Sequence, residues 1–250
     1  MINLSGQTAL VTGGNRGIGR AAALLLAQSG ADVALTYNTR AAEAEATAGA
    51  IRSLGRSAWT SGGDLADPEV AGRLATAVQR QSGGLDILIA NAGVWPAEER
   101  RLADISIDRW RRTIHSNLDS VYVSLRALLP LVRGGGRVVI VSSTAGQRGE
   151  AFHGDYAATK GALISLTKSL AIEYAPTITV NCVAPGWVDT EMSAPAYTPE
   201  NRERIRATIP VGRIASAEDV AGPILFLCSD LSRHLTGEVL NVNGGSVLCG

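Results

Sequence analysis

The sequence predicts a single α/β domain in which helices cover both faces of a doubly wound sheet of seven parallel strands. Short β-branched apolar runs alternate with longer Ala- and Leu-rich stretches, which is the pattern of βα units in a parallel sheet. A glycine-rich turn follows the first run, where such sheets bind dinucleotides. No linker or repeat interrupts the series. We therefore expect residues 1–250 to form one Rossmann-type domain for dinucleotide binding and catalysis.

The strands are expected where Val, Ile, Leu and Thr gather in short runs bounded by turn residues. They lie at about residues 8–12, 32–37, 57–60, 85–90, 136–142, 178–183 and 238–242. Right-handed βαβ crossovers then give the strand order 3-2-1-4-5-6-7.

The stretches between these runs are expected to be helices. The first ends before Gly30, a common stop for a helix, and the fifth ends before Pro176. The irregular segment at about residues 190–213, with three prolines and a charged run, is expected to cover the substrate at the carboxyl edge of the sheet. The helices are expected at about residues 18–29, 40–54, 67–82, 106–132, 154–174 and 216–229.

Composition excludes several classes of protein. Hydrophobic residues make up 46% of the chain and charged residues 18%, which is enough apolar surface for a large core. The formal net charge is zero, so we expect no nucleic-acid partner. No apolar run reaches the ~18 residues that span a bilayer, and the three cysteines lack metal-ligand spacing. We expect a cytoplasmic protein with no membrane partner, no disulfide framework and no bound metal.

The turn at residues 12–19 reads TGGNRGIG and has the spacing G-x-x-x-G-x-G. Glycine permits a sharp turn, and it lets the backbone and the following helix N-terminus approach a pyrophosphate closely. An ordinary βα turn can match by chance, but the strand before and the helix after favour a dinucleotide site. The cofactor-binding residues expected here are Gly13, Asn15, Arg16, Gly17, Ile18 and Gly19.

The end of the second strand indicates which dinucleotide binds. NAD-binding proteins usually place a carboxylate there for the ribose 2′-hydroxyl, but this strand ends at Tyr37, followed by Asn38 and Thr39. Arg16 and Arg40 can bind a 2′-phosphate, although the alternative is that both are solvated surface cations. We therefore expect NADP(H) as the cofactor, with NAD(H) as the second choice.

Tyr156 and Lys160 are four residues apart on an expected helix, so their side chains share one face. Ser143 follows a strand at the carboxyl edge of the sheet. Reduction of a ketone needs a proton donor beside the oxygen and a group that polarises the carbonyl. We expect Tyr156 to be the acid, with its pKa lowered from ~10 by the Lys160 ammonium. A Tyr–Lys pair at this spacing and a serine after a strand are each common in proteins. Only their combination is specific enough to indicate this chemistry.

Together these motifs resemble the short-chain dehydrogenase/reductase family. The resemblance extends from the glycine turn to near the carboxyl end and includes Ser143, Tyr156 and Lys160 in that order. The chain departs from the family pattern at Ala90, where the family often has asparagine, and this costs at most one structural hydrogen bond. The other residues that carry the resemblance are Asp64, Asn91, Ala92, Gly93, Asn117, Pro185, Gly186 and Thr190.

The resemblance implies a role for each of these residues. Tyr156 is similar in position to the family's general acid/base, Ser143 to the donor that holds the substrate oxygen, and Lys160 to the lysine that binds the cofactor ribose. Asn117 resembles the residue that holds a water between the lysine and solvent. The remaining cofactor contacts implied are the adenine at Asp64 and Leu65, the ribose at Asn91, Ala92 and Gly93, and the nicotinamide carboxamide at Val188 and Thr190; Pro185 and Gly186 are also implied to bind the cofactor.

The resemblance also implies a homotetramer with the helices at 106–132 and 154–174 between subunits. The overall pattern is most similar to 3-oxoacyl-[acyl-carrier-protein] reductases, which implies NADP(H)-dependent reduction of a small-molecule ketone, such as a 3-oxoacyl thioester, to a secondary alcohol. An acyl carrier protein is a weakly supported partner, because the loop at residues 173–177 is short and lacks arginine.

Other functions remain open from sequence. The main alternative is an NAD(P)-dependent sugar, polyol or other alcohol dehydrogenase, and a non-catalytic dinucleotide-sensing protein is a weaker one. Trp95 and Trp187 either line the substrate cleft or serve packing. His115 and His153 are expected to be structural or surface residues.

Overall fold

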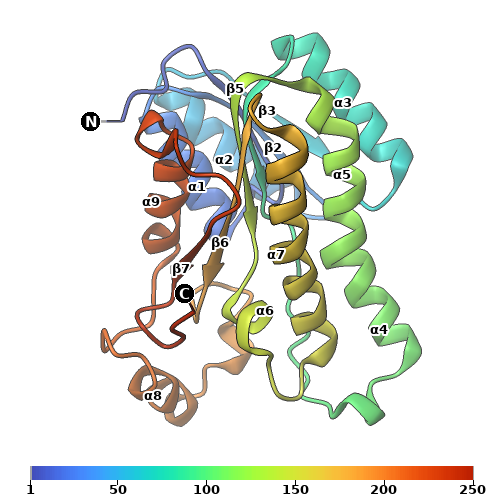
Figure 1. Cartoon of the computed structure of the whole chain (residues 1–250), viewed down its shortest axis with the longest axis vertical. Coiled ribbons are helices and arrows are strands. Elements are labelled where there is room, and N and C mark those ends of the chain that lie inside the picture. The colour runs from blue at the N-terminus through green and yellow to red at the C-terminus, as the bar shows by residue number, and fades with distance from the viewer. Residues whose placement is uncertain (1, 250) are drawn as a thin grey trace.

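The computed structural model describes residues 2–249, and a sheet of seven parallel strands forms their centre (Figure 1). The strand order is β3-β2-β1-β4-β5-β6-β7 with every neighbouring pair parallel, which confirms the expected topology. The strands are β1 (Thr8–Val11), β2 (Asp32–Tyr37), β3 (Ala58–Gly62), β4 (Leu85–Ala90), β5 (Val132–Val141), β6 (Thr179–Pro185) and β7 (Val239–Val242).

Helices cover both faces of the sheet (Figure 1). Leu26 and Ile224 are buried in the core on one face, and Leu74 and Leu163 in the core on the other. Strand side chains alternate between the two faces, so the strands from β1 to β6 contribute to both cores. The first face carries α1 (Gly17–Gln28), α2 (Ala41–Ser53) and α9 (Ala217–Leu227), and the second carries α3 (Pro68–Ser82), α4 (Ile107–Ile114), α5 (Ser120–Leu128) and α7 (Gly154–Tyr174).

The helix expected at 106–132 is present and runs without interruption through residues 107–128, so the expectation is wrong only at its end. A five-residue π-helical turn at His115–Asp119 lies within it, between α4 and α5. This turn places Asn117 in the interior, where it is 0% exposed and bonds the backbone of Val94. A 3-10 turn at Leu129–Leu131 then leads directly into β5, so no helix reaches residue 132.

Two helices lie in stretches for which the sequence predicted no helix. Ser143 begins α6 (Thr144–Arg148), and its hydroxyl accepts a hydrogen bond from the Ala145 N–H at 3.2 Å. The segment at 190–213 contains α8 (Pro199–Ala207), which Thr198 caps through the Asn201 N–H. A Thr-Pro pair is a helix start signal, so α8 was readable from the sequence.

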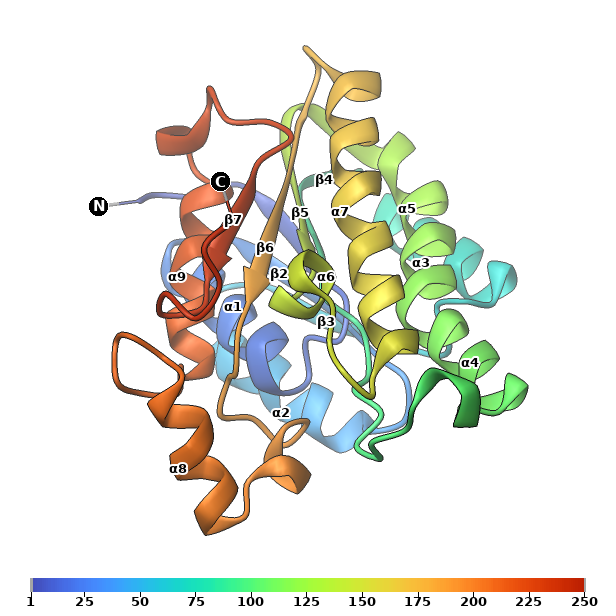
Figure 2. The same ribbon diagram turned by 60° about the horizontal axis from the view of Figure 1, so that its bottom comes forward.

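The carboxyl ends of the strands meet at one edge of the sheet, at the bottom of Figure 1, and Figure 2 turns this edge forward. The segment with α8 lies at this edge, beside the ends of β6 and α6 (Figure 2). Ligands of doubly wound sheets bind at such an edge. Among residues 2–249, no helix has both the length and the apolar character needed to cross a membrane.

Candidate active site

The glycine turn joins β1 to α1 at the carboxyl edge. Gly13 and Gly17 have positive φ values of 63° and 51°, a conformation that favours glycine. A Cβ at Gly19 would lie 2.2 Å from the Gly13 carbonyl oxygen, so the first turn of α1 comes too close to the loop for any side chain. The free N–H groups of the helix N-terminus therefore face the space above the turn, where they can bind an anion.

Thr12 and Asn91 lock this turn to the end of β4. The Thr12 hydroxyl accepts hydrogen bonds from the backbone N–H groups of Asn91 and Ala92, at 2.9 and 3.0 Å. The Asn91 side-chain amide donates to the carbonyl oxygens of Thr12 and Gly13, at 3.0 and 3.2 Å. Thr12 was not among the expected site residues, and its function is to fix the position of the phosphate-binding turn relative to the next strand.

A cavity of about 260 Å³, the dinucleotide cavity, lies above the turn. Its walls fit a dinucleotide, because a helix N-terminus, small glycines and the cations Arg16 and Arg40 meet there. Tyr37 at the end of β2 offers no carboxylate to a ribose. Of the expected cofactor residues, those that line this cavity are Gly13, Asn15, Arg16, Gly17, Ile18, Gly19, Tyr37, Asn38, Thr39, Asp64, Leu65, Asn91, Ala92, Gly93 and Thr190.

A second cavity of about 130 Å³, the substrate cavity, adjoins the first. Ser143, Tyr156 and Lys160 line it, so the structure brings three of the four expected catalytic residues together. Pro185, Gly186 and Val188 line the same cavity from the end of β6. The two cavities adjoin each other, because both are lined by Ile18, Asn91, Gly93, Val94, Thr190 and Met192.

Asn117 lies behind the cavity wall. Its side chain accepts a hydrogen bond from the Val94 N–H at 2.7 Å and donates to the Val94 carbonyl at 3.0 Å. A Cβ added to Gly93 would lie 2.9 Å from the Asn117 amide oxygen and 3.5 Å from Lys160 Nζ. Asn117 therefore fastens the loop after β4 next to Lys160.

Tyr156 and Lys160 lie one helical turn apart on α7 and are both buried. Lys160 Nζ lies 5.7 Å from the centre of the Tyr156 ring and donates to the Val141 carbonyl at 2.9 Å. Burial raises the pKa of Tyr156 to about 12, the Ser143 hydroxyl opposes that shift, and the Glu150 carboxylate adds to it. Burial also lowers the pKa of Lys160 to about 8.

These directions correct the expectation that Lys160 lowers the Tyr156 pKa. The Lys160 ammonium lies over the ring face and bonds a carbonyl, and the loss of water around the phenol dominates. Tyr156 therefore holds its proton throughout the neutral pH range, which is the form that an acid catalyst of ketone reduction needs.

Aromatic side chains form one wall of the substrate cavity, which settles the open question about Trp95 and Trp187. Both residues line the cavity, and their rings lie 6.1 Å apart. Trp95 also contacts the Tyr156 ring edge-on at 4.7 Å and stacks on His153 at 4.0 Å. His153 is buried and supports this wall, as expected of a structural residue. Tyr197 lies behind Trp187 at 5.8 Å.

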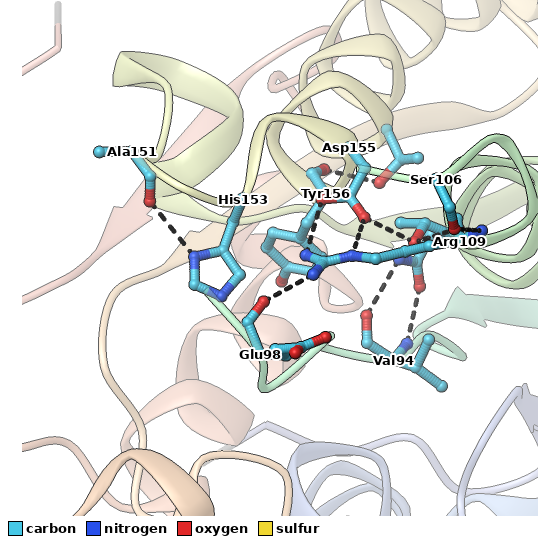
Figure 3. Close-up of polar contacts among 11 residues, drawn as sticks. Val94, Glu98, Ser106, Arg109, Ala151, His153, Asp155 and Tyr156 are labelled. Atoms are coloured by element: carbon cyan, nitrogen blue, oxygen red, sulfur yellow. Dashed lines mark hydrogen bonds and ion pairs between the residues drawn. The ribbon is translucent and has the colours of Figure 1, made fainter. Parts of the chain in front are cut away.

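A buried ion pair that sequence reasoning missed supports the start of α7 (Figure 3). The Asp155 carboxylate accepts hydrogen bonds from Arg109 Nε at 3.0 Å and from the Thr113 hydroxyl at 2.9 Å. Arg109 also donates to the Glu98 carbonyl at 2.7 Å, so it ties α4, α7 and the loop after β4 together. Burial raises the Asp155 pKa, but these hydrogen bonds outweigh it and hold the pKa below its usual value.

Comparisons with known proteins identify the family of this chain. Residues 13–246 match the family described as "Enoyl-(Acyl carrier protein) reductase". L-rhamnose 1-dehydrogenase (NAD(P)(+)) from Sphingomonas sp. (strain SKA58) is 38% identical over 247 residues, 97% of this chain and 96% of the relative. The 3-oxoacyl-[acyl-carrier-protein] reductase of Aquifex aeolicus (strain VF5) is 38% identical over 250 residues, 98% of each chain.

Solved structures give the same result. A short chain dehydrogenase from Burkholderia cenocepacia J2315, crystallised in complex with NADP, superposes with a TM-score of 0.91 at 38% identity, covering 98% of this chain and 99% of the other. Fold, site and relatives together define an NAD(P)-dependent oxidoreductase that acts on CH–OH and C=O groups. The chain belongs to the short-chain dehydrogenase/reductase family.

Proposed function

We propose that this enzyme uses NADPH to reduce a small ketone to a secondary alcohol. The observation that carries the proposal is the Tyr156 phenol, which lines a cavity together with Ser143 and Lys160, and this cavity adjoins the dinucleotide cavity. The phenol holds its proton at neutral pH, so it can give that proton to the oxygen of a ketone. The presence of Ser143, Tyr156 and Lys160 on one cavity also argues against a non-catalytic sensor.

Four side chains and the dinucleotide each have a separate role in the proposed reaction. NADPH, when bound, supplies the hydride that reduces the carbonyl carbon. Ser143 donates a hydrogen bond that holds the substrate oxygen, and Tyr156 gives its proton to that oxygen as negative charge develops. Lys160 binds the cofactor ribose, and Asn117 holds the neighbouring loop and, by family resemblance, a water that leads to solvent.

The preference for NADP(H) rests on charge. Arg16 and Arg40 line the cavity on either side of the end of β2, and Tyr37 leaves that end without a carboxylate. A guanidinium binds a phosphate dianion with charge-assisted hydrogen bonds, whereas a ribose hydroxyl gains only a neutral one. The relative from Burkholderia cenocepacia, which was crystallised with NADP, supports this preference.

The substrate cavity suits a free small molecule better than a carrier-bound one. Two tryptophans line the cavity, and Arg148 and Arg202 each have a carboxylate partner, Glu150 and Asp189. These ion pairs would have to open before either arginine could contact an acidic carrier protein, which makes docking there less favourable. Arg133 bonds Asp86 near the amino end of β5, away from the site.

Oxidation of a sugar is the second candidate function. A tryptophan face suits the apolar side of a sugar ring, and L-rhamnose 1-dehydrogenase is among the similar proteins. Purified enzyme should be assayed for NADPH oxidation with small ketones and with a 3-oxoacyl thioester, free and carrier-bound, and for NADP⁺ reduction with L-rhamnose. Faster sugar oxidation than ketone reduction at neutral pH would replace the proposed function with this second one.

We also propose that the chain forms a homotetramer and acts in the cytoplasm. Ile107 on α4, Tyr122 on α5 and Ile172 on α7 are exposed, on the helices that the family resemblance places between subunits. Sedimentation at micromolar concentration tests the tetramer, and a monomer would refute it.

The segment at 190–213 is proposed to cover the substrate, because it supplies Thr190, Met192 and Ser193 to the substrate cavity.

A further inference from the structure

Glu191 bonds the two arginines that are proposed to bind the 2′-phosphate of the cofactor. One carboxylate oxygen of Glu191 bonds Arg40 at 2.7 Å and Arg16 at 3.3 Å. Arg16 comes from the glycine turn and Arg40 from the start of α2, whereas Glu191 comes from the far side, after β6. All three residues line the dinucleotide cavity.

The same two guanidinium groups are the cations available to a 2′-phosphate. Arg40 also bonds Glu43 of its own helix at 2.9 Å, so the two arginines face two carboxylates and the cluster is neutral before any ligand enters. The other residues at this end of the cavity, Tyr37, Asn38 and Thr39, carry no formal charge at neutral pH. A phosphate that binds here must displace Glu191 or lie close to its negative charge.

We propose that Glu191 is a specificity-determining residue that competes with the cofactor 2′-phosphate for Arg16 and Arg40. Its carboxylate lowers the affinity for NADP(H) and leaves the affinity for NAD(H) nearly unchanged, because a ribose hydroxyl has no need of both arginines. The discrimination between the two dinucleotides is therefore smaller than the arginines alone would give. This inference rests on the proposed binding of the 2′-phosphate at these arginines.

Glu43 supplies a matched control. It has the same side chain, the same negative charge and the same partner, Arg40, but it does not line the dinucleotide cavity. Neutralising either glutamate changes the net charge of the protein equally. Only the removal of Glu191 frees both arginines toward the cavity, so a general electrostatic effect and direct competition give different results.

The test is calorimetric titration of the wild-type protein, Glu191→Gln and Glu43→Gln with NADPH, NADH and adenosine 2′,5′-bisphosphate. The last probe carries the phosphate without the nicotinamide, so its binding is independent of catalysis. In Glu191→Gln, NADPH and the bisphosphate should bind about fivefold to tenfold more tightly, as expected when one charge near a surface ion pair is removed. NADH should change by less than about twofold, and Glu43→Gln should give less than half of the NADPH effect on a logarithmic scale.

Three results would overturn the proposal. If Glu191→Gln weakened NADPH and NADH alike, Glu191 would hold both dinucleotides in place instead of competing. If the ratio of NADPH to NADH affinity stayed the same, or if Glu43→Gln matched Glu191→Gln, there would be no direct competition. A failure of the proposed cofactor preference is seen separately, as wild-type protein that binds the bisphosphate no better than adenosine 5′-monophosphate.

Discussion

Two carboxylate–arginine clusters stand at the site, and they differ in burial. The side chains of Asp155 and Arg109 are 0% and 11% exposed, whereas those of Glu191 and Arg40 are 58% and 45% exposed. A buried pair is costly to break, because the remaining charge is left without water or a partner. An exposed pair exchanges readily with solvent and other ions. The buried cluster therefore fixes the catalytic helix, and the exposed cluster can be replaced by a ligand.

The largest effect on activity is expected at Tyr156, the buried residue that is proposed as the proton donor. Tyr156→Phe removes the acidic hydroxyl and keeps the ring that contacts Trp95, so we expect a loss of about 10²–10⁴ in kcat for ketone reduction. NADPH affinity, measured by fluorescence titration, should change little, because the glycine turn binds the pyrophosphate independently. Near-normal turnover of a good ketone substrate would disprove the catalytic role of Tyr156.

Asp155→Ala tests whether the buried cluster is a fixed support. It leaves Arg109 nearly buried without its carboxylate, so we expect the free energy of unfolding in denaturant to fall by about 3–5 kcal/mol. Asp155→Asn keeps the shape of the side chain and should lose less. Because Asp155 precedes Tyr156, kcat should fall more than KM rises in both variants.

The sequence predicted the sheet and the position of the site, because both depend on local patterns. Apolar runs mark strands, and side chains after the ends of parallel strands meet at one edge, so Ser143 and the glycine turn could be placed together. The Asp155–Arg109 pair could not be found in this way, since the partners are 46 residues apart and Asp155 resembles an ordinary acid in a first helical turn.

Other failures have the same physical origin. Asn117 lies in the π-helical turn and bonds the backbone of Val94, and that partner comes from another part of the chain. The direction of the Tyr156 pKa depends on burial, which the spacing of Tyr156 and Lys160 does not reveal. Local signals thus predict which residues gather at the site, and long-range contacts decide how water and charge are arranged around them.

The pH dependence of the free energy of unfolding tests whether water reaches Lys160. Its pKa is lowered by burial from 10.5 to about 8, so between these two pH values the unfolded chain holds a proton that the folded chain lacks. Stability due to Lys160 therefore rises with pH across that window. Relative to Lys160→Met, the wild-type protein should gain about 1–3 kcal/mol of unfolding free energy between about pH 7.5 and pH 10.

Denaturant unfolding of both proteins at several pH values provides the measurement. Tyr156, whose pKa is raised by burial, is present in both proteins, so its opposite contribution above about pH 10 largely cancels in the difference. A difference that stays constant with pH would mean that water reaches Lys160. The contrast between buried charges beside the catalytic residues and exposed charges at the dinucleotide cavity would then be wrong.

The smallest effect is expected at the exposed side. Arg202 on α8 pairs with Asp189, with side chains 45% and 51% exposed, and it lies 4.9 Å from the Tyr197 ring centre. Arg202→Ala should change the free energy of unfolding by less than about 1 kcal/mol, because water solvates both charges once the pair is broken. Urea unfolding of this variant beside Asp155→Ala measures the contrast directly. If Arg202→Ala lost as much unfolding free energy as Asp155→Ala, the segment at 190–213 would be as firmly fixed as α7. Glu191, which belongs to this segment, would then be held too rigidly to give way to a phosphate.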